Sequence, residues 1–374
     1  MVGAADGDRG ADDLVAGAVM TGVLLWLTAC APEVADTPDE VDDITFLSTP
    51  GPYGVGHTQR DVTYDDVTGS PRTLRTSVWY PTHADAGFAA TYWHGAFISS
   101  VAFEDVEPAI DAEFPTVVYS HGHQGYAEAS SFLAEHLTSH GYYVLAPDHT
   151  GNTTLDGSYR DTAIYLQRPG DLGAVMDALV AGQLVADPRA TGDVVAVGHS
   201  FGGYSAYAWS GAEYDAAAID AACTAGGAES ICTSWDAEWS ALFSAGAADD
   251  RVRAAVAMAP GDFWLLGADH VAAMPVPALL MTGEHDPERD ADGALYAAAS
   301  ARAGGHWVDI DGGAHNTFAD VAGSMSDGQT LVPEVGHRIV RTFVLAHAET
   351  QLGRGRYGAL LDGTESVDPV VTAE

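Results

Sequence analysis

The stretch VVAVGHSFGGYSAY, residues 194–207, joins a valine-rich run to a glycine-rich turn and then to small and aromatic residues that suit a helix. A short apolar run that ends in glycines predicts a buried strand, so the stretch is interpreted as strand, turn and helix. The turn, residues 198–202, has the spacing G-x-S-x-G, which places a serine on a strained strand-to-helix turn. The pattern also arises by chance, so the rest of the chain decides whether Ser200 is reactive.

From about residue 60 onward, short apolar runs alternate with longer runs of helical period. This alternation predicts an α/β fold with a mostly parallel central sheet and helices on both faces. Residues 211–250 interrupt the alternation and are expected to form an insertion, placed where a lid would lie. Strands are expected at 73–81, 114–122, 142–149, 193–200, 253–260, 276–283 and 306–310, and helices at 169–186, 201–210, 291–303 and 334–349.

Composition narrows the classes of function. The chain has 374 residues and is 47% hydrophobic, so it can bury a large core. Its 15 Lys and Arg residues stand against 53 Asp and Glu residues, a formal net charge of -38. This charge repels phosphates, so no nucleic acid partner is expected, and an anionic membrane surface is disfavoured.

The N-terminal segment is expected to direct export. Residues 14–27 form an apolar run of signal-peptide length that ends before Cys30, and Leu27-Thr28-Ala29-Cys30 resembles a bacterial lipobox. The preceding region departs from the usual positive charge, because Arg9 is its single basic residue. We therefore expect a signal peptide at 1–30 with Cys30 lipidated, and a protein attached to the cell envelope or secreted. Membrane contact is expected through that anchor alone.

The remaining domain boundaries are predicted from the polarity of the sequence. Residues 31–49 are predicted to be an acidic tether, 50–350 the folded domain, and 351–374 a flexible tail. If Cys30 carries a lipid, Cys223 and Cys232 remain as a pair that can bridge in an oxidising compartment. Their polar surroundings favour a disulfide over two free thiols in the core.

A reactive serine needs a base, and the base needs an acid that orients it. Asp286 follows the predicted strand at 276–283, and His315 follows the one at 306–310. Ser, Asp and His in this order, each at a strand end, are typical of α/β-hydrolases. We therefore predict Ser200 as nucleophile, His315 as base and Asp286 as the orienting acid.

An oxyanion hole of backbone donors is also expected. Its donors would be the N–H of Phe201, directly after the serine, and the N–H of His123, in the turn after the strand at 114–122. A metal site built from His121, His123, Asp148 and His149 is the competing interpretation of that turn. Because the serine arrangement accounts for the same turn, no metal and no other cofactor is expected. The turn at Ser200 lacks the G-x-G-x-x-G spacing of a dinucleotide site and the Gly-Lys-Ser/Thr of a Walker loop.

Taken together, several motifs resemble one branch of a known superfamily. They are FPTVVYSHGHQGY, YYVLAPDHTGNT, GHSFGG, GEHDPE and GGAHNTF, and nearer the N-terminus GPYGVGHTQRDVTY and SVWYP. The similarity covers approximately residues 50–348. This set is similar to the platelet-activating-factor acetylhydrolase and dienelactone-hydrolase-like branch of the α/β-hydrolases, which implies the α/β-hydrolase fold. In some acetylhydrolases the acid follows an earlier strand, so the resemblance makes Asp262 the alternative to Asp286.

The expected activity is hydrolysis of carboxylic esters, either small molecules or polymers, through an acyl-enzyme. Short-chain or oxidised lipid esters are the first expectation, with polyesters and lactones as alternatives. A surface binding protein that keeps this fold without turnover is the alternative from another class. Phe263, Trp264 and Phe318 either line an apolar acyl site or belong to the core.

Overall fold

The computed structural model describes residues 42–157, 160–227, 230–291, 304–324, 326–365 and 371–373. The predicted signal peptide and lipobox, with Cys30, lie outside the described residues. So do most of the predicted tether and all but the first residue of the helix predicted at 291–303.

A mixed sheet forms the centre of the domain. Its strands within the described residues follow the order β11-β10-β9-β8-β7-β5-β6-β2-β1-β4-β3. Neighbours from β6 through β5, β7, β8 and β9 to β10 pair in parallel, whereas β2 pairs antiparallel with both β6 and β1. The strands are β1 (Gly54–Asp65), β2 (Pro71–Thr82), β3 (Ala89–Tyr92), β4 (Phe97–Glu104), β5 (Phe114–Ser120), β6 (Tyr143–Pro147), β7 (Ala190–His199), β8 (Val252–Met258), β9 (Ala278–Gly283), β10 (His306–Ile310) and β11 (Val371–Ala373).

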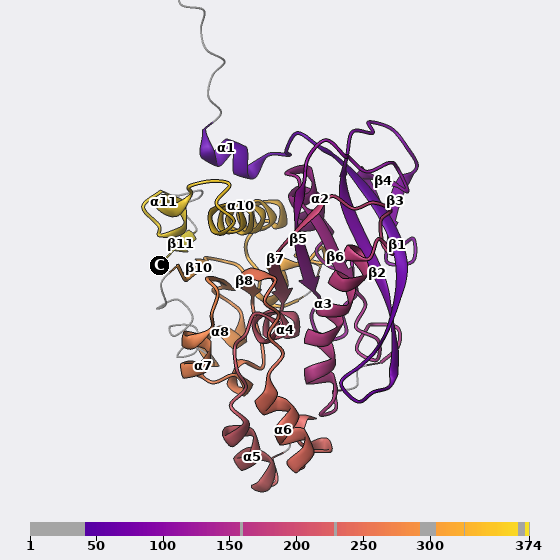
Figure 1. Ribbon diagram of the computed structural model, residues 1–374. Helices are drawn as coiled ribbons and strands as arrows, with labels where there is room; N and C mark the ends of the chain where they lie inside the picture. The colour runs from indigo at the N-terminus through magenta and orange to yellow at the C-terminus, as the bar shows by residue number, and fades with distance from the viewer. Residues whose placement is uncertain are drawn as a thin grey trace, which may run out of the picture. The chain divides into compact units, whose positions relative to one another are not determined.

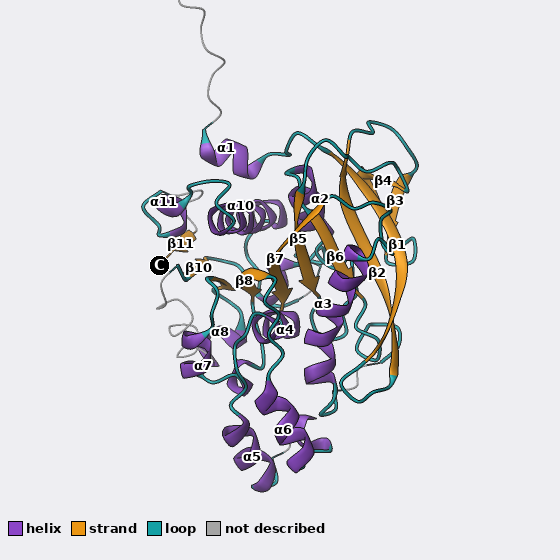
Figure 2. Cartoon of the chain, in the orientation of Figure 1, coloured by secondary structure: helices purple, strands orange, loops and turns teal. Residues whose placement is uncertain are grey.

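Helices cover both faces of this sheet, and Figures 1 and 2 show the strands as the central layer. Val117 of β5 belongs to the core under α2 and α10, whereas the next residue, Val118, belongs to the core under α3 and α4. Because both faces are buried, the strands are continuous apolar runs, and the predicted α/β fold with a mostly parallel sheet is confirmed. None of the described helices is both long and apolar enough to cross a membrane. The covering helices are α2 (Ser131–Ser139), α3 (Ile164–Val180), α4 (Phe201–Trp209) and α10 (Pro333–Gln351).

The predicted insertion is a small helical unit between α4 and β8. It contains α5 (Ala216–Thr224), a 3-10 turn at Ser230–Thr233 and α6 (Ala237–Ala245), which Figure 1 shows beyond the strands. Cys223 and Cys232 form the predicted disulfide within it. Ile219, Ile231 and Phe243 are buried in the cluster that also packs on α4. The unit therefore has apolar anchors, and its role as a lid stays a prediction.

The folded domain extends beyond the predicted boundaries at 50 and 350. Leu47, in the predicted tether, is buried, as are Leu360 and Leu361 in the predicted flexible tail, and all three join one core cluster. β11 also pairs antiparallel with β10. Polarity alone missed these segments because only a few apolar side chains hold each one. The short elements are α1 (Asp43–Ser48), α7 (Ala268–Ala273), α8 (Pro287–Ala291), α11 (Gly358–Leu361) and 3-10 turns at Phe263–Leu265 and His315–Phe318.

The turn between β7 and α4 lies directly against the end of β5. A Cβ atom added to Gly202 would be 1.9 Å from the carbonyl oxygen of Ser120, and one added to Gly198 would be 1.9 Å from the carbonyl oxygen of Gly202. Both distances are far inside van der Waals contact, and the atoms met are backbone. Only glycine therefore allows this crossing, which is a physical reason for the G-x-S-x-G spacing.

We expect Leu361→Ala to lower the free energy of unfolding by roughly 2–5 kcal/mol, because it leaves a cavity in the core. Urea denaturation followed by circular dichroism measures this change. Leu155→Ala is the control, since Leu155 is 66% exposed. Equal stability of the two variants would show that the C-terminal segment does not belong to the core.

We expect Gly202→Ala to destabilise the domain by roughly 3 kcal/mol, because the added methyl group meets backbone atoms of β5. Gly358→Ala is the matched control, since a Cβ atom there meets nothing within 4 Å. The same denaturation experiment compares the two. A Gly202→Ala protein as stable as the control would contradict the close approach.

Candidate active site

Ser200, Asp286 and His315 meet at the carboxyl edge of the sheet. Ser200 directly follows β7, Asp286 follows β9, and His315 follows β10. These three strands are parallel, with β8 between β7 and β9, so their carboxyl ends lie at the same edge. The fold thus brings together residues that are 115 positions apart in the chain.

Hydrogen bonds connect the three side chains in series. His315 Nε2 lies 2.8 Å from Ser200 Oγ, and His315 Nδ1 lies 3.1 Å from Asp286 Oδ1. Because a carboxylate accepts hydrogen bonds, Nδ1 carries the proton, which leaves the Nε2 lone pair to accept from the Ser200 hydroxyl. The backbone N–H of Glu288 also donates to Asp286 Oδ1, at 3.1 Å, and holds the buried carboxylate in place.

The surroundings tune His315 toward accepting a proton. Burial lowers the pKa of His315, but the hydrogen bond to Asp286 and the charge of that carboxylate outweigh burial, so the net shift is upward. The carboxylates of Glu288 and Asp327 act in the same direction. His315 is therefore a stronger base than an isolated imidazole.

Ser200 adopts a backbone conformation that residues other than glycine rarely use, with φ 56° and ψ -125°. Its N–H donates to the carbonyl oxygen of Met258 at 2.9 Å, and its carbonyl oxygen accepts from the N–H of Gly203 at 2.8 Å. These bonds to β8 and α4 hold the strained residue. Such strain is concentrated at functional sites and presents the side chain at the top of the turn.

His199 is a contributor that the sequence analysis did not identify. Its Nε2 donates to the carbonyl oxygen of His315 at 2.7 Å and so fixes the backbone of His315. Burial, together with the nearby His315, lowers the pKa of His199 to about 3, so this ring is neutral. Position 199 is the first variable position of G-x-S-x-G, so the motif does not predict which group the side chain there will contact.

The turn after β5 lies against Ser200, as the oxyanion prediction requires. A Cβ atom added to Gly122 would be 3.1 Å from the Cβ of Ser200. Phe201 begins α4, and the first N–H groups of a helix have no partner within the helix. The two predicted donors, on Phe201 and His123, therefore belong to segments that touch at Ser200.

His121 fixes the peptide group that carries the N–H of His123. Its Nδ1 donates to the carbonyl oxygen of Gly122 at 2.7 Å, and its Nε2 accepts from the N–H of His149 at 3.1 Å. The N–H of Gly125 donates to the same carbonyl at 3.0 Å. In a trans peptide the C=O and N–H groups point in opposite directions, so these bonds also orient the N–H of His123.

Asp262, the alternative acid, is not placed beside His315. Its carboxylate pairs with Arg160, and its φ of 60° turns the backbone away from the extended path of β8. Burial raises the pKa of Asp262, and the Arg160 guanidinium opposes that shift. The structure thus brings Asp286, and not Asp262, to His315.

The four residues of the competing metal site are held by other partners. His121 bonds within its own turn, His123 Nδ1 accepts from Asn152, and Asp148 pairs with Arg75 at 2.7 Å. His149 lies between Ser120 and Asp171. Among the described residues, no group of three His, Cys, Asp or Glu side chains is arranged to hold a metal ion.

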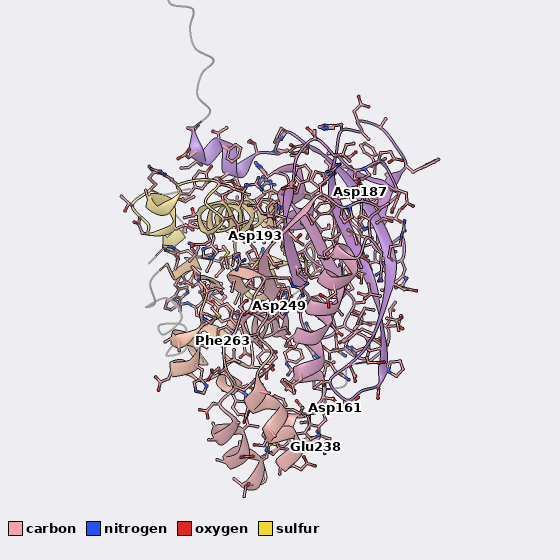
Figure 3. All side chains as sticks on the ribbon, viewed as in Figure 1. Asp161, Asp187, Asp193, Glu238, Asp249 and Phe263 are labelled. Atoms are coloured by element: carbon pink, nitrogen blue, oxygen red, sulfur yellow. A yellow bond between two sulfur atoms is a disulfide. The ribbon has the colours of Figure 1, made fainter. Side chains whose placement is uncertain are left out.

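Two of the three aromatic residues considered for the lining of an acyl site are not accessible to a substrate. Phe263, labelled in Figure 3, and Phe318 are fully buried in core clusters, so these two belong to the core. Trp264 is half-buried and packs on the cluster that contains Phe263. Sequence alone could not separate the two roles, because aromatic residues at strand ends serve both.

Comparisons with known proteins agree with this architecture. The family model described as Serine aminopeptidase, S33 matches residues 112–247, which include the turn after β5 and Ser200. A ferulic acid esterase from Streptomyces cinnamoneus is structurally similar, with a TM-score of 0.59 and 23% sequence identity over 87% of this chain and 97% of that chain. No curated protein matches the sequence. With the sheet order and Ser200 after β7, these findings show that the chain has the α/β-hydrolase fold.

Proposed function

We propose that the protein is a serine hydrolase of carboxylic esters. The observation that carries this proposal is the series Ser200–His315–Asp286, joined by hydrogen bonds of 2.8 and 3.1 Å on a strained turn. A protein that only binds a ligand has no need of a nucleophile, a base and an orienting acid that are joined by hydrogen bonds. The alternative of a silent binding protein is therefore disfavoured.

The geometry supports a two-step acyl transfer. As Ser200 Oγ attacks the ester carbonyl, His315 Nε2 takes its proton, and the buried Asp286 carboxylate stabilises the imidazolium. The N–H groups of His123 and Phe201 would hold the developing oxyanion. His315 then returns the proton to the leaving alcohol, and water hydrolyses the acyl-enzyme by the same steps.

The substrate class is the finer part of the proposal. The resemblance to the acetylhydrolase and dienelactone-hydrolase-like branch favours short-chain or oxidised lipid esters over polyesters and lactones. The similarity to a ferulic acid esterase adds esters of ferulic acid to the substrates to be tested. A panel graded by acyl length, with a phospholipid, a lactone, a feruloyl ester and a polyester film, separates these classes.

Export through a lipidated Cys30 remains part of the proposal. The disulfide between Cys223 and Cys232 supports it, because such bridges persist in oxidising compartments and are rare in the cytosol. Membrane attachment would then depend on the lipid and not on the acidic domain.

We expect Ser200→Ala to lower kcat for a p-nitrophenyl ester by a factor on the order of 10⁶, because no other group can take the acyl chain. The wild type should also react with a fluorophosphonate probe, and the variant should not. Undiminished turnover by Ser200→Ala would eliminate the mechanism. A folded wild type that neither turns over esters nor reacts with the probe would favour the silent binder.

The raised pKa of His315 predicts the pH dependence. The base works in its neutral form, so kcat/KM should rise with pH and reach half its plateau above pH 6.5, the ordinary imidazole pKa. Asp286→Asn removes the charge that raises this pKa, so the midpoint should move to lower pH. The plateau should also fall by a factor on the order of 10⁴.

Asp262→Asn is the comparison that decides between the two acids. Its carboxylate faces Arg160 and not His315, so the midpoint of the pH profile should stay where it is in the wild type. A shift with Asp262→Asn and none with Asp286→Asn would reverse the assignment of the acid.

A further inference from the structure

The guanidinium of Arg168, on α3, is fully buried beneath the proposed oxyanion hole. Burying a cation costs several kcal/mol unless strong partners compensate. Within the described residues, every hydrogen bond from Arg168 goes to a neutral oxygen and none to a carboxylate. Burial lowers the pKa of Arg168, and the charge of Asp171 opposes that shift from farther away. An arrangement this unfavourable needs a reason beyond filling space.

One side of the guanidinium holds the turn that carries His123. Nη2 donates to the carbonyl oxygen of His121 and, at 3.1 Å, to the hydroxyl of Ser120. Nη1 donates to Asn152 Oδ1 at 2.9 Å, and the amide nitrogen of Asn152 donates to His123 Nδ1 at 2.9 Å. Arg168 is therefore linked to this turn twice, through the backbone carbonyl oxygen of His121 and through the side chain of His123.

The other side of the same group holds Phe201. Nε donates to Ser205 Oγ at 3.1 Å, and Ser205 Oγ donates to the carbonyl oxygen of Phe201 at 3.0 Å. The Arg168 Cζ atom also lies 4.6 Å from the centroid of the Phe201 ring. Phe201 is thus attached to Arg168 through both its ring and its backbone.

We propose that Arg168 is a positioning residue that sets the two oxyanion donors, His123 and Phe201, relative to each other. The inference rests on the proposed function and deepens it. The donors come from different loops, and an oxyanion hole works only when both N–H groups lie within about 3 Å of one oxygen. A planar group with five donors in a rigid fork can tie two loops together in a way that a lysine cannot.

The charge of Arg168 acts in the same direction as its geometry. A buried cation that no hydrogen-bonded carboxylate neutralises produces a positive potential, which is strong in a medium of low dielectric constant. That potential favours negative charge on the substrate oxygen in the transition state more than it favours the neutral ester. Arg168 touches no reacting atom, so its geometry acts through the two donor residues, whereas its charge acts through space.

Arg168→Lys tests the proposal, because it keeps the charge and loses the fork. We expect kcat/KM for a p-nitrophenyl ester to fall by a factor of about 10²–10³, the scale of one lost oxyanion donor. KM should stay within threefold of the wild type. The affinity for a trifluoromethyl ketone, whose adduct with Ser200 carries an oxyanion, should fall by about the same factor as kcat/KM.

Arg354→Lys is the matched control. Arg354 also donates to a backbone carbonyl oxygen, that of His140 at 3.1 Å, and its Cζ atom lies 4.8 Å from the centroid of the Tyr142 ring. It shares the carbonyl bond and the aromatic contact with Arg168, but it also pairs with Glu349 at 3.1 Å and lies away from Ser200. Its replacement can lower the melting temperature, whereas kcat and ketone affinity should stay within threefold.

Two milder variants keep the proposal testable if Arg168→Lys does not fold. Asn152→Ala removes the link from Arg168 to His123, and Ser205→Ala removes the link from Arg168 to the backbone of Phe201, so each should lower kcat/KM and ketone affinity together, by about tenfold. Arg168→Lys with both quantities within threefold of the wild type would overturn the proposal. So would Asn152→Ala and Ser205→Ala proteins that both keep full ketone affinity. Failure of the proposed function would be seen separately, as undiminished turnover by Ser200→Ala.

Discussion

The contact between the first turn of α4 and the end of β5 is the constraint on which the site depends. At Gly202 the two backbones approach so closely that a methyl group would lie 1.9 Å from the carbonyl oxygen of Ser120. This contact places α4 directly over the parallel strands and forces Ser200 into its strained conformation. It also brings the turn after β5, with Gly122, against the serine. The positions of Ser200, of the N-terminus of α4 and of the turn after β5 are therefore consequences of one close approach.

A buried polar layer supports this crossing from beneath. The fully buried carboxylate of Asp171 accepts from Arg72 at 2.7 and 2.9 Å and from Tyr64 at 2.6 Å. It also accepts from His149 Nδ1 at 2.8 Å, and His149 leads through Ser120 to Arg168. Each polar group is satisfied by the next, so removing one would leave another buried without a partner. This dependence explains how a buried arginine can persist under the proposed oxyanion hole without a carboxylate of its own.

The sequence predicted what depends on local pattern and chain order. Continuous apolar runs indicated buried parallel strands, and the order of Ser200, Asp286 and His315 at strand ends indicated the line that the structure shows. The pattern could not predict Arg168, because an arginine on an apolar helix is usually at the surface and its burial depends on which strands the helix covers. The choice between Asp286 and Asp262 likewise depends on the tertiary structure, because Asp262 has a left-handed backbone conformation and its carboxylate pairs with Arg160. The extra elements at both ends escaped prediction because Leu47, Leu360 and Leu361 belong to apolar runs of only two or three residues within otherwise polar segments.

The distribution of charge raises a last question, because an acidic protein is a poor environment for an oxyanion. All 15 basic residues are arginines against 53 carboxylates. Most surface carboxylates act through water and salt, which screen them beyond about 10 Å at 0.1 M ionic strength. By contrast, the guanidinium groups of Arg160 and Arg168 lie 4.2 and 4.6 Å from the Phe201 ring, and Arg168 is fully buried. Arginine suits this position because its guanidinium is more weakly hydrated than an ammonium group. Arg168 thus places one unscreened positive charge beside Phe201, whereas Arg160 is paired with Asp262 and many of the other arginines are partly exposed.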